Sequence, residues 1–458
     1  MLEILTNRTY RHLFAAQIFS LIGTGLTTVA LGLLAYDLAG ANAGAVLGTA
    51  LALKMVAYVG IAPIAGPIAA RLPRRQLLVT LDAIRAGFVL LLPFVSEIWQ
   101  IYALVFLFQA CSAIFTPTFQ ATIPEILPDE RQYTRALSLS RLAYDLESLV
   151  SPLLAGLLLT VITFQWLFIG TTLGFLASAL LVVSAGVPSL VKRLADETSF
   201  WERVTRGLKI YLKTPRLRAL LALNFAVSAA GAMIIVNTVV HVRASLGGSD
   251  SDVAMLFAAY GLGSMAVALS LPRLFDHLTP RSIMLPAGAV LAVLTALGAT
   301  ADTFAISLIL WPAMGAAVSA VMTPGGLLLR RSSHSDDRPA LFSAHFALSH
   351  AGWLITYPLA GWLGARAGLD VTFLVMAVLA LAGVGLAAAL WPRPDEETLE
   401  HAHPVQEHTH THVHDEHHQH DHEGWEGPEP HSHPHRHGML RHAHPFVIDD
   451  HHPVWPSG

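Results

Sequence analysis

Cysteine is nearly absent from this chain of 458 residues, and charged residues are scarce. The single cysteine, Cys111, excludes an internal disulfide and cysteine-rich zinc or iron–sulfur sites. Only 13% of the residues are charged, against about 25% in a typical soluble domain, and the mean hydropathy is +0.53. No cleavable signal-peptide pattern precedes the first apolar run, and no phosphate-binding loop of the G-x-x-x-x-G-K-[ST] type is present. The composition therefore indicates a membrane protein without an ATP site.

The few charges and most of the histidines are unevenly distributed. Residues 399–458 hold 18 of the 24 histidines, ten acidic residues and two arginines, which gives a formal charge of −8 with neutral histidine. Residues 1–398 hold 26 basic and 22 acidic residues, which gives +4. The sequence thus consists of a long apolar part and a polar, histidine-rich tail.

Apolar runs divide the first part into membrane spans. A transmembrane helix needs about 20 mostly apolar residues. Reading the runs between charged, proline and glycine residues predicts twelve spans, at 12–37, 44–69, 76–96, 99–121, 136–160, 164–187, 217–241, 251–272, 281–300, 303–329, 339–364 and 369–391. The expected fold is an all-α membrane protein with a disordered tail, since a core-free polar segment cannot fold alone.

Basic residues indicate the orientation, because short cytoplasmic loops retain lysine and arginine. With the N-terminus inside, 21 of these residues lie on the cytoplasmic side and only Arg243 and Arg366 lie outside. The sequence therefore predicts a multi-pass protein of the bacterial cytoplasmic (inner) membrane. Both termini and the histidine tail are expected to be cytoplasmic.

An internal repeat divides the spans into two groups of six. Thr116-Pro117, Ala136-Leu137 and the stretch 152–156 recur in the same order as Thr323-Pro324, Ala340-Leu341 and the stretch 358–361, at offsets of 204 to 207 residues. The predicted units are residues 1–187, a linker at 188–216, residues 217–391, and a tail at 392–458. Chance similarity between Leu/Ala-rich helices is the alternative explanation.

The loop after the second span is basic and resembles a known signature. It matches the G-x-L-A-D-R-x-G-R-R loop of the major facilitator superfamily at Gly66, Ala69, Arg71, Arg74 and Arg75. Ala70 and Pro73 stand where that family usually has aspartate and glycine. The alternative is a basic loop that only sets topology. Asp82 and Arg85, three residues apart on one helix face, are expected to replace part of the missing gating charge network.

The fifth span carries a second motif. Residues 148–156 resemble the G-x-x-x-G-P-x-x-x-G antiporter motif of exporters in the same superfamily, with Ser148 and Ser151 in place of glycines and Pro152 and Gly156 retained. Small residues let helices approach closely, and proline permits a bend. The resemblance implies export.

Ionisable side chains within the spans are candidates for coupling, because they are costly unless they are paired or face water. Asp145 and Glu147 lie about 200° apart around the fifth span, so both cannot face one cavity; we favour Asp145. Arg141, four residues before Asp145, offers a structural ion pair instead. Lys54, inside the second span, is either a counter-ion or directed outward to the interface.

Two histidines occupy the repeat-related place in the eleventh span. Imidazole binds zinc, cobalt, nickel and copper(II). His345 and His350 are about 140° apart around a helix, so at most one of them faces a central cavity. A hydrogen-bonded histidine packed against Ser349 is an equally good interpretation of His350.

The tail carries the clearest chemical pattern. Alternating His-x-His in a flexible segment allows imidazoles to surround a cation, while interleaved carboxylates concentrate cations locally. The candidate metal ligands are His401, His403, His408, His410, His412, His414, His417, His418, His420, His422, His431, His433, His435, His437, His442 and His444. A solvated tag without physiological metal is the alternative.

These features together resemble the nickel-resistance permeases of the NreB type within the major facilitator superfamily. The resemblance implies a monomeric transporter, not an enzyme, that exports Ni(II) in exchange for protons by alternating access, with the tail capturing or sensing metal. The ligands alone equally allow Co(II) or Zn(II). No cofactor and no nucleic acid are expected, and the partners are the divalent metal, protons and the lipid bilayer. Two alternatives remain: a siderophore- or drug-type organic exporter with a metal-sensing tail, and a membrane-anchored metal store.

Overall fold

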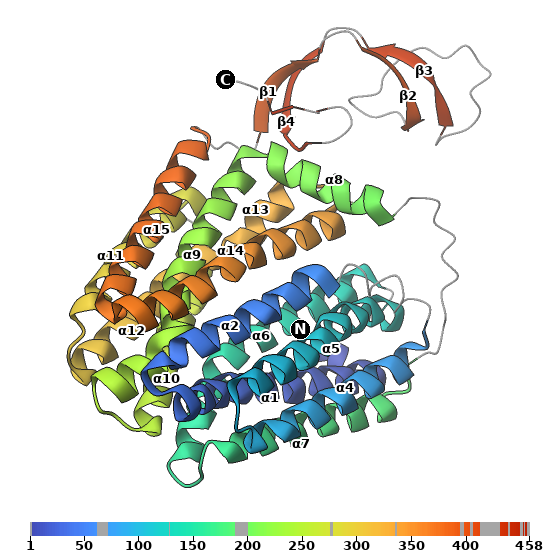
Figure 1. Ribbon diagram of the computed structural model, residues 1–458. Coiled ribbons are helices and arrows are strands. Elements are labelled where there is room, and N and C mark those ends of the chain that lie inside the picture. The colour runs from blue at the N-terminus through green and yellow to red at the C-terminus, as the bar shows by residue number, and fades with distance from the viewer. Residues whose placement is uncertain are drawn as a thin grey trace.

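The structure is a computed structural model that describes residues 2–61, 72–127, 129–187, 200–274, 278–334, 337–393, 398–403, 406–412, 431–437, 440–448, 452 and 454–455. Two bundles of long helices lie side by side, and the histidine-rich tail lies beyond one end of them (Figure 1). The end that carries the linker helix α8 (Phe200–Lys213) is called the linker end below.

The first bundle contains the six helices predicted for the first half. They are α1 (Arg8–Ala39), α2 (Ala43–Val56) continued by a π-helical turn (Ala57–Ile61), α4 (Arg74–Leu91), α5 (Ile98–Ile126), α6 (Glu130–Leu159) and α7 (Gln165–Ser184). Side-chain caps fix two starts: Asn7 accepts a hydrogen bond from the Tyr10 amide at 3.1 Å, and Asp129 accepts one from the Gln132 amide at 2.9 Å.

The second bundle repeats this order. It comprises α9 (Pro215–Val240), α10 (Asp250–Leu274), α11 (Pro280–Leu297), α12 (Phe304–Met322) with the short α13 (Gly325–Arg331), α14 (Arg338–Ala367) and α15 (Leu369–Leu390). The predicted span 303–329 is therefore broken. Pro324, which lacks an N–H to continue the ladder, stands between α12 and α13.

The packing of the two bundles follows one scheme. α1 packs on α7 as α9 packs on α15, and α4 packs on α7 as α11 packs on α15. Across the bundles, α2 packs on α14 and α10 packs on α6. The second helix of each half thus packs against the fifth helix of the other half, which is consistent with a parallel repeat.

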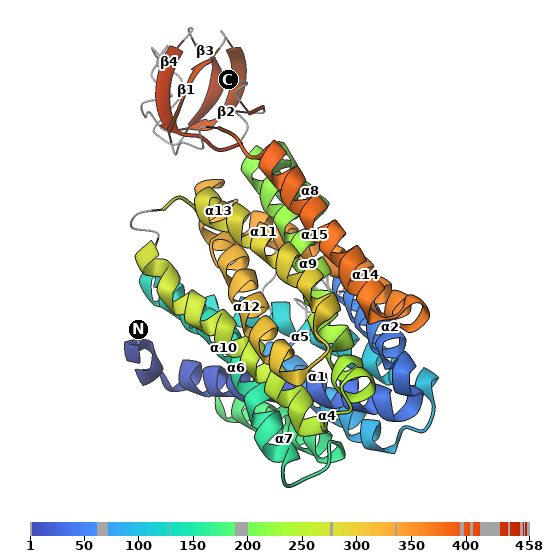
Figure 2. The ribbon, with the colours of Figure 1, turned by 90° about the vertical axis from the view of Figure 1, so that its left-hand side faces the viewer.

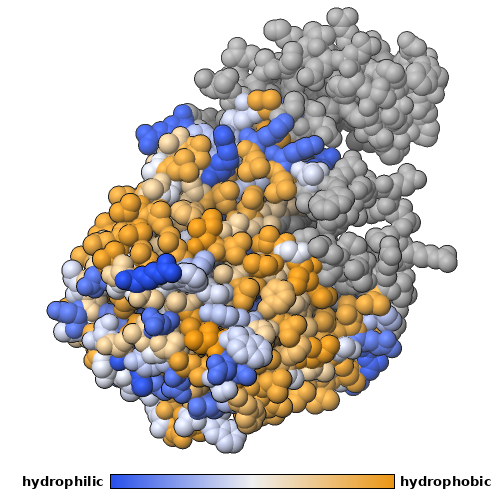
Figure 3. Space-filling model, in the orientation of Figure 1, coloured by the Kyte–Doolittle hydropathy of each residue, from blue (hydrophilic) through white to orange (hydrophobic). Residues whose placement is uncertain are grey.

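The outer surface matches a bilayer. Large apolar side chains such as Phe94, Leu180, Leu269 and Ile309 are more than two-thirds exposed, and the visible face is mostly apolar (Figure 3). Nine segments of the described residues are long and apolar enough to cross a membrane, and the first, Arg8–Ile61, contains both α1 and α2. The chain is a multi-pass membrane protein.

In the described part of the tail, four short strands pair two by two. β1 (Thr398–His403) pairs antiparallel with β4 (Leu440–Pro445), and β2 (Gln406–His412) pairs antiparallel with β3 (His431–His437). These strands lie beyond α8 (Figure 2). The alternation His-x-His has the two-residue period of a strand.

The end of the tail returns to the helices. Phe446, Val447 and Ile448 are buried, and Phe446 shares a buried cluster with Trp391 after α15. Arg216 at the start of α9 is 2% exposed, donates to the Phe446 carbonyl at 3.3 Å, and lies 4.8 Å from the Trp455 ring. The histidine-rich segment is therefore anchored at both of its ends.

Candidate functional site

A cavity of about 410 Å³ lies between the two bundles. Its wall combines hydroxyl, amide, aromatic and charged side chains from both halves. Its polar and aromatic lining residues include Gln17, Ser20, Thr24, Thr28, Lys54, Tyr58, Arg85, Gln109, Ser112, Thr116, Tyr144, Glu147, Tyr260 and Tyr357. This volume falls within the range of small-molecule sites, about 300–1,000 Å³.

Glu147 of α6 and Lys54 of α2 provide opposite charges on this wall. They lie close enough to act on each other electrostatically. Gly25 of α1 makes room for the carboxylate: a Cβ at this position would stand 2.6 Å from Glu147 Oε1 and would also overlap Ser151. The glycine therefore allows α1 to pack directly beside a carboxylate within the bundle.

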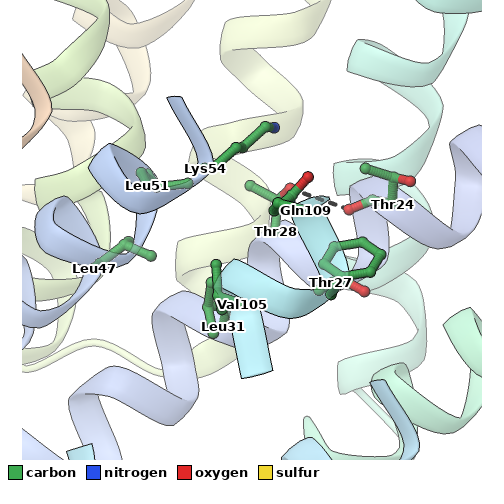
Figure 4. A pocket seen from close by; sticks show the side chains of 10 residues that line it. Thr24, Thr27, Thr28, Leu31, Leu47, Leu51, Lys54, Val105 and Gln109 are labelled. Atoms are coloured by element: carbon green, nitrogen blue, oxygen red, sulfur yellow. Dashed lines mark hydrogen bonds between the residues drawn. The ribbon is translucent and has the colours of Figure 1, made fainter. Parts of the chain in front are cut away.

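A smaller pocket extends this wall between α1, α2 and α5. Its volume is about 20 Å³, and Thr24, Thr28, Lys54 and Gln109 line both it and the larger cavity. Figure 4 shows Thr24 and Thr28 on α1, Lys54 on α2 and Gln109 on α5 around it. Lys54 thus shares this pocket with neutral polar groups of α1 and α5, beside apolar side chains such as Leu51 and Val105.

Asp82 and Arg85 form the pair expected from their spacing. Asp82 is bonded to Arg85 and also accepts a hydrogen bond from Ser178 at 2.8 Å. The guanidinium lies 4.0 Å from the Phe115 ring and 4.4 Å from the Phe175 ring. Both residues are buried more than two turns inside α4, and Arg85 also borders the cavity.

The basic loop is partly described. Gly66 and Arg71 lie outside the described residues. Arg74 and Arg75 form the first turn of α4, and Arg75 donates to the Val183 carbonyl near the end of α7 at 2.6 Å. This contact joins α4 to α7 within the first half and satisfies a carbonyl in the last turn of a helix.

The antiporter-like motif lies where the halves meet. Gly156 of α6 approaches α10 so closely that a Cβ there would stand 3.1 Å from the Ala254 methyl group. Ser151 is fully buried beside Gly25 and Glu147. The side chains of Ser148 and Pro152 lie outside the described ones.

One carboxylate of α6 lines the cavity among the described side chains. The sequence-based prediction favours Asp145, and the described carboxylate on the cavity wall is Glu147. The side chains of Asp145 and Arg141 lie outside the described ones, so their proposed ion pair stays a prediction. Periodicity shows that only one carboxylate can face the cavity, but the face is fixed by the packing of α1 and α10 against α6.

The two histidines of α14 have separate surroundings. His345 Nδ1 lies 3.0 Å from the Tyr211 hydroxyl and its ring stacks on Tyr211 of the linker helix. His350 Nδ1 lies 2.7 Å from the Phe346 carbonyl and 3.5 Å from Ser349 Oγ, and its ring lies 6.0 Å from that of Tyr58. His345 therefore contacts the linker, and His350 is held through Nδ1 at the Phe346 carbonyl.

The linker contact has a simple electrostatic basis. Burial raises the pKa of the Tyr211 phenol well above its usual range, so the hydroxyl stays protonated. A protonated hydroxyl can donate to a neutral imidazole nitrogen. His345 thus serves the attachment of α8 to α14 in this structure.

A three-ligand metal site is absent from the described part of the membrane domain: no group of three His, Cys, Asp or Glu side chains converges there. Of the predicted tail ligands, His414, His417, His418, His420 and His422 lie outside the described residues. The other eleven lie on the four strands.

Sequence reasoning missed the tyrosines of the site. Tyr58, Tyr144, Tyr260 and Tyr357 border the cavity, and they come from both halves. Tyr58, Tyr260 and Tyr357 stand in apolar stretches, where an aromatic residue usually packs in a core. Their hydroxyl groups provided a weak signal, because buried tyrosine hydroxyls need partners.

Contacts between the halves gather at the end remote from α8. Trp362 of α14 donates to Thr49 of α2 at 2.9 Å, and Gly361 packs against Gly44. Nearer the linker end, the Tyr58 ring lies 6.1 Å from the Phe346 ring. Small-residue contacts thus join the halves at one end, and an aromatic contact made by the cavity-lining Tyr58 joins them toward the other.

Comparisons with known sequences agree with this architecture. Macrolide efflux protein A of Streptococcus pyogenes is 26% identical over 215 residues, covering 46% of this chain and 52% of that protein. The chain thus spans about half the length of these curated relatives. The MFS-type transporter YvqJ of Bacillus subtilis is 23% identical over 362 residues, covering 75% and 83%.

Solved structures share the fold at low sequence identity. The nucleoside transporter NupG gives a TM-score of 0.63 at 13% identity, covering 84% of this chain and all of that one. An inward-facing bacterial homologue of the lysosomal transporter Spinster gives 0.66 at 12% identity, covering 83% and 96%. The profile of the Major Facilitator Superfamily matches residues 13–241 and 220–413. Since these matches span most of the chain, it belongs to the major facilitator superfamily of transporters.

Proposed function

We propose that the chain exports a divalent transition metal, Ni(II) first, in exchange for protons. The observation that carries the coupling is Glu147, a carboxylate on the cavity wall with Lys54 as its counter-charge. A carboxylate inside a span is costly when it is charged and unpaired, so one that faces a cavity is suited to binding protons and cations in turn.

The exchange follows from charge balance at this pair. When Glu147 is ionised, Lys54 compensates its charge across the cavity. A divalent cation that reaches the carboxylate competes with Lys54, and a proton from the other side restores the neutral acid after the cation leaves. The neutral hydroxyl and amide groups around Lys54 can hydrogen-bond the ammonium group while it is displaced.

The metal assignment rests on the tail and on the resemblance to nickel-resistance permeases. Imidazole favours late first-row divalent ions, and cysteine is limited to one residue. Orientation by the positive-inside rule makes the linker end cytoplasmic. The tail then lies on the side from which an exporter collects its substrate.

An organic solute is the second candidate, and the size of the cavity favours it. A space of about 410 Å³ lined by four tyrosines exceeds the needs of a single ion. Aromatic rings and dispersed hydroxyl groups are typical of sites for small organic molecules. In this alternative the tail senses metal and the cavity carries a different substrate.

Proteoliposomes containing the purified chain distinguish these candidates. With an imposed pH gradient and a nickel-sensitive dye inside, the wild type should accumulate Ni(II) and move protons in the opposite direction. Glu147→Gln should abolish Ni(II)-dependent proton movement, since an amide cannot exchange a proton. Asp302→Asn, which changes an exposed carboxylate outside the cavity, should leave it intact.

The outcomes separate the hypotheses. Coupled Ni(II) flux that persists in Glu147→Gln would move the coupling site elsewhere. Absence of Ni(II) flux in the wild type, together with proton-coupled transport of a small organic solute, would favour the second candidate. A variant lacking residues 399–458 tests the metal-store alternative, because a transporter retains flux without its tail whereas a store loses all function.

A further inference from the structure

The two halves are in close contact at the end remote from α8, which is called the remote end below. Gly361 of α14 leaves no room for a Cβ beside the Gly44 carbonyl of α2. Gly48 of α2 is packed in the same way beside the Tyr357 carbonyl of α14. Because backbone meets backbone here, the cavity opens toward the remote end only when these contacts separate.

The turn that joins α9 to α10 at the remote end carries an arginine and an aspartate. It begins with a π-helical segment (His241–Ser245), which is closed by a hydrogen bond from the Leu246 amide to the His241 carbonyl at 3.0 Å. Arg243 of this segment binds Asp250 at the start of α10, with 2.9 Å between Nη1 and Oδ1. The turn and the ion pair thus fix the guanidinium group on the second half.

This guanidinium group also contacts the first half. Its central carbon lies 5.4 Å from the centre of the Tyr36 ring, in the last turn of α1. A cation is attracted to an aromatic face within about 6 Å. Asp37, the next residue of α1, lies close enough to Asp250 for their charges to act on each other. Arg243 therefore attracts a ring of the first half and neutralises one of two carboxylates that belong to different halves.

We propose that Arg243 is a latch of the remote end: it holds the turn after α9 against the end of α1 while the halves are closed on this side, and it leaves Tyr36 when they separate. The Arg243 and Asp250 side chains are each 33% exposed. A partly exposed contact of this kind is weak enough to break and re-form in each transport cycle, whereas a buried ion pair is not.

Removal of the arginine has two effects of the same sign. It removes the attraction to Tyr36, and it leaves Asp37 and Asp250 without a cation between their charges, so that these two carboxylates repel each other across the halves. Both effects favour an open remote end. The latch concerns the closure of the halves, so it stands whether the cavity carries a metal ion or an organic solute.

Distances between spin labels at the remote end test the latch in the full-length protein. Ser96→Cys, between α4 and α5, and Asp302→Cys, between α11 and α12, place one label at an exposed position of each half. Cys111→Ser removes the native thiol. Double electron–electron resonance in lipid nanodiscs at pH 7.5, without added solute, then measures the ratio of open to closed remote ends.

Arg243→Gln should raise the ratio of open to closed ends about two- to fivefold, the factor that corresponds to an exposed cation–π contact. Adding Asp37→Asn should restore part of the closed population, since it removes the remaining repulsion. The matched control is Arg366→Gln. Arg366 also lies at the remote end and over an aromatic ring, but that ring, Trp362 at 5.1 Å, belongs to its own helix, so the distances should match the wild type.

Two further measurements separate a latch from a merely structural residue. Arg243→Lys keeps the charge and should retain most of the closed population. Thermal unfolding of Arg243→Gln should stay close to that of the wild type, because the contact is partly exposed. An unchanged ratio in Arg243→Gln, or an equal shift in Arg366→Gln, would overturn the proposal. The experiment needs no transported solute, so a failure of the transport assay leaves its outcome unaffected.

Discussion

At the scale of single residues, the site depends on a glycine as much as on a charge. Glu147 reaches the cavity wall beside α1 because Gly25 has no side chain there. Ser151, one helical turn after Glu147, packs into the same space. The position of the carboxylate is therefore fixed by helix packing, and the local sequence around Glu147 does not reveal it.

Gly25→Ala should destabilise the protein and impair transport. The added methyl group overlaps Glu147 Oε1 and Ser151, and overpacking of this kind costs about 1–3 kcal/mol. Thermal unfolding in detergent measures the first effect, and proton-coupled flux in proteoliposomes measures the second. The unfolding temperature and the proton-coupled flux should decrease together.

Two variants serve as controls for this substitution. Gly87→Ala in α4 places a methyl group in open space and should be neutral. Adding Ser151→Gly to Gly25→Ala removes one of the two overlaps and should recover part of the stability. Unchanged stability and flux in Gly25→Ala would show that α1 and α6 are not packed at this distance.

At the scale of elements, the described contacts attach the linker helix α8 to the second half. Arg206 of α8 binds Asp337 before α14 through Nε at 2.5 Å and a terminal nitrogen at 3.2 Å. Asp337 is 7% exposed and its side chain does not cap α14. Gly207 permits α8 to approach the backbone of α14 at Ala340. The linker thus follows the second half.

Arg206→Gln should loosen α8 without unfolding the bundle. The Arg206 side chain of this ion pair is about half exposed, so loss of the pair should lower stability by roughly 1 kcal/mol. Hydrogen exchange of the α8 amides should accelerate about fivefold, which corresponds to that energy. Lys209→Gln, an exposed change on the same helix, should leave exchange unchanged. Equal exchange in both variants would mean that Tyr211 and the backbone contact hold α8 alone.

The sequence predicts helices better than it predicts their faces. Each of the twelve spans predicted from apolar runs falls on a helix of the described residues, because each run must cross the same bilayer thickness. The predicted span 303–329 contains Pro324, and the helix is interrupted at this proline. The position of Glu147 on the cavity wall depends on long-range packing, which no local pattern encodes. The two-residue period of the tail strands, by contrast, is visible locally in the alternation His-x-His.

At the scale of the whole molecule, two helical halves and the tail form a connected system. α2 and α6 of the first half pack against α14 and α10 of the second. The tail leaves α15 and returns to Arg216 at the start of α9, so both of its anchors belong to the second half. In the proposed function, metal held by the tail would therefore lie beside the second half.

Trp455→Ala should release the end of the tail while leaving its histidines intact. The indole lies on the Arg216 guanidinium and against the Phe446 ring, at 4.8 and 5.1 Å, so its removal weakens the returning contact. Limited trypsin digestion after Arg436 and Arg441 should become several-fold faster, because opening of the anchored segment precedes cleavage. Val454→Ala, at a neighbouring position that is 73% exposed, should digest as the wild type does. Identical digestion of both variants would show that Phe446 and Ile448 suffice to hold the tail on the second half.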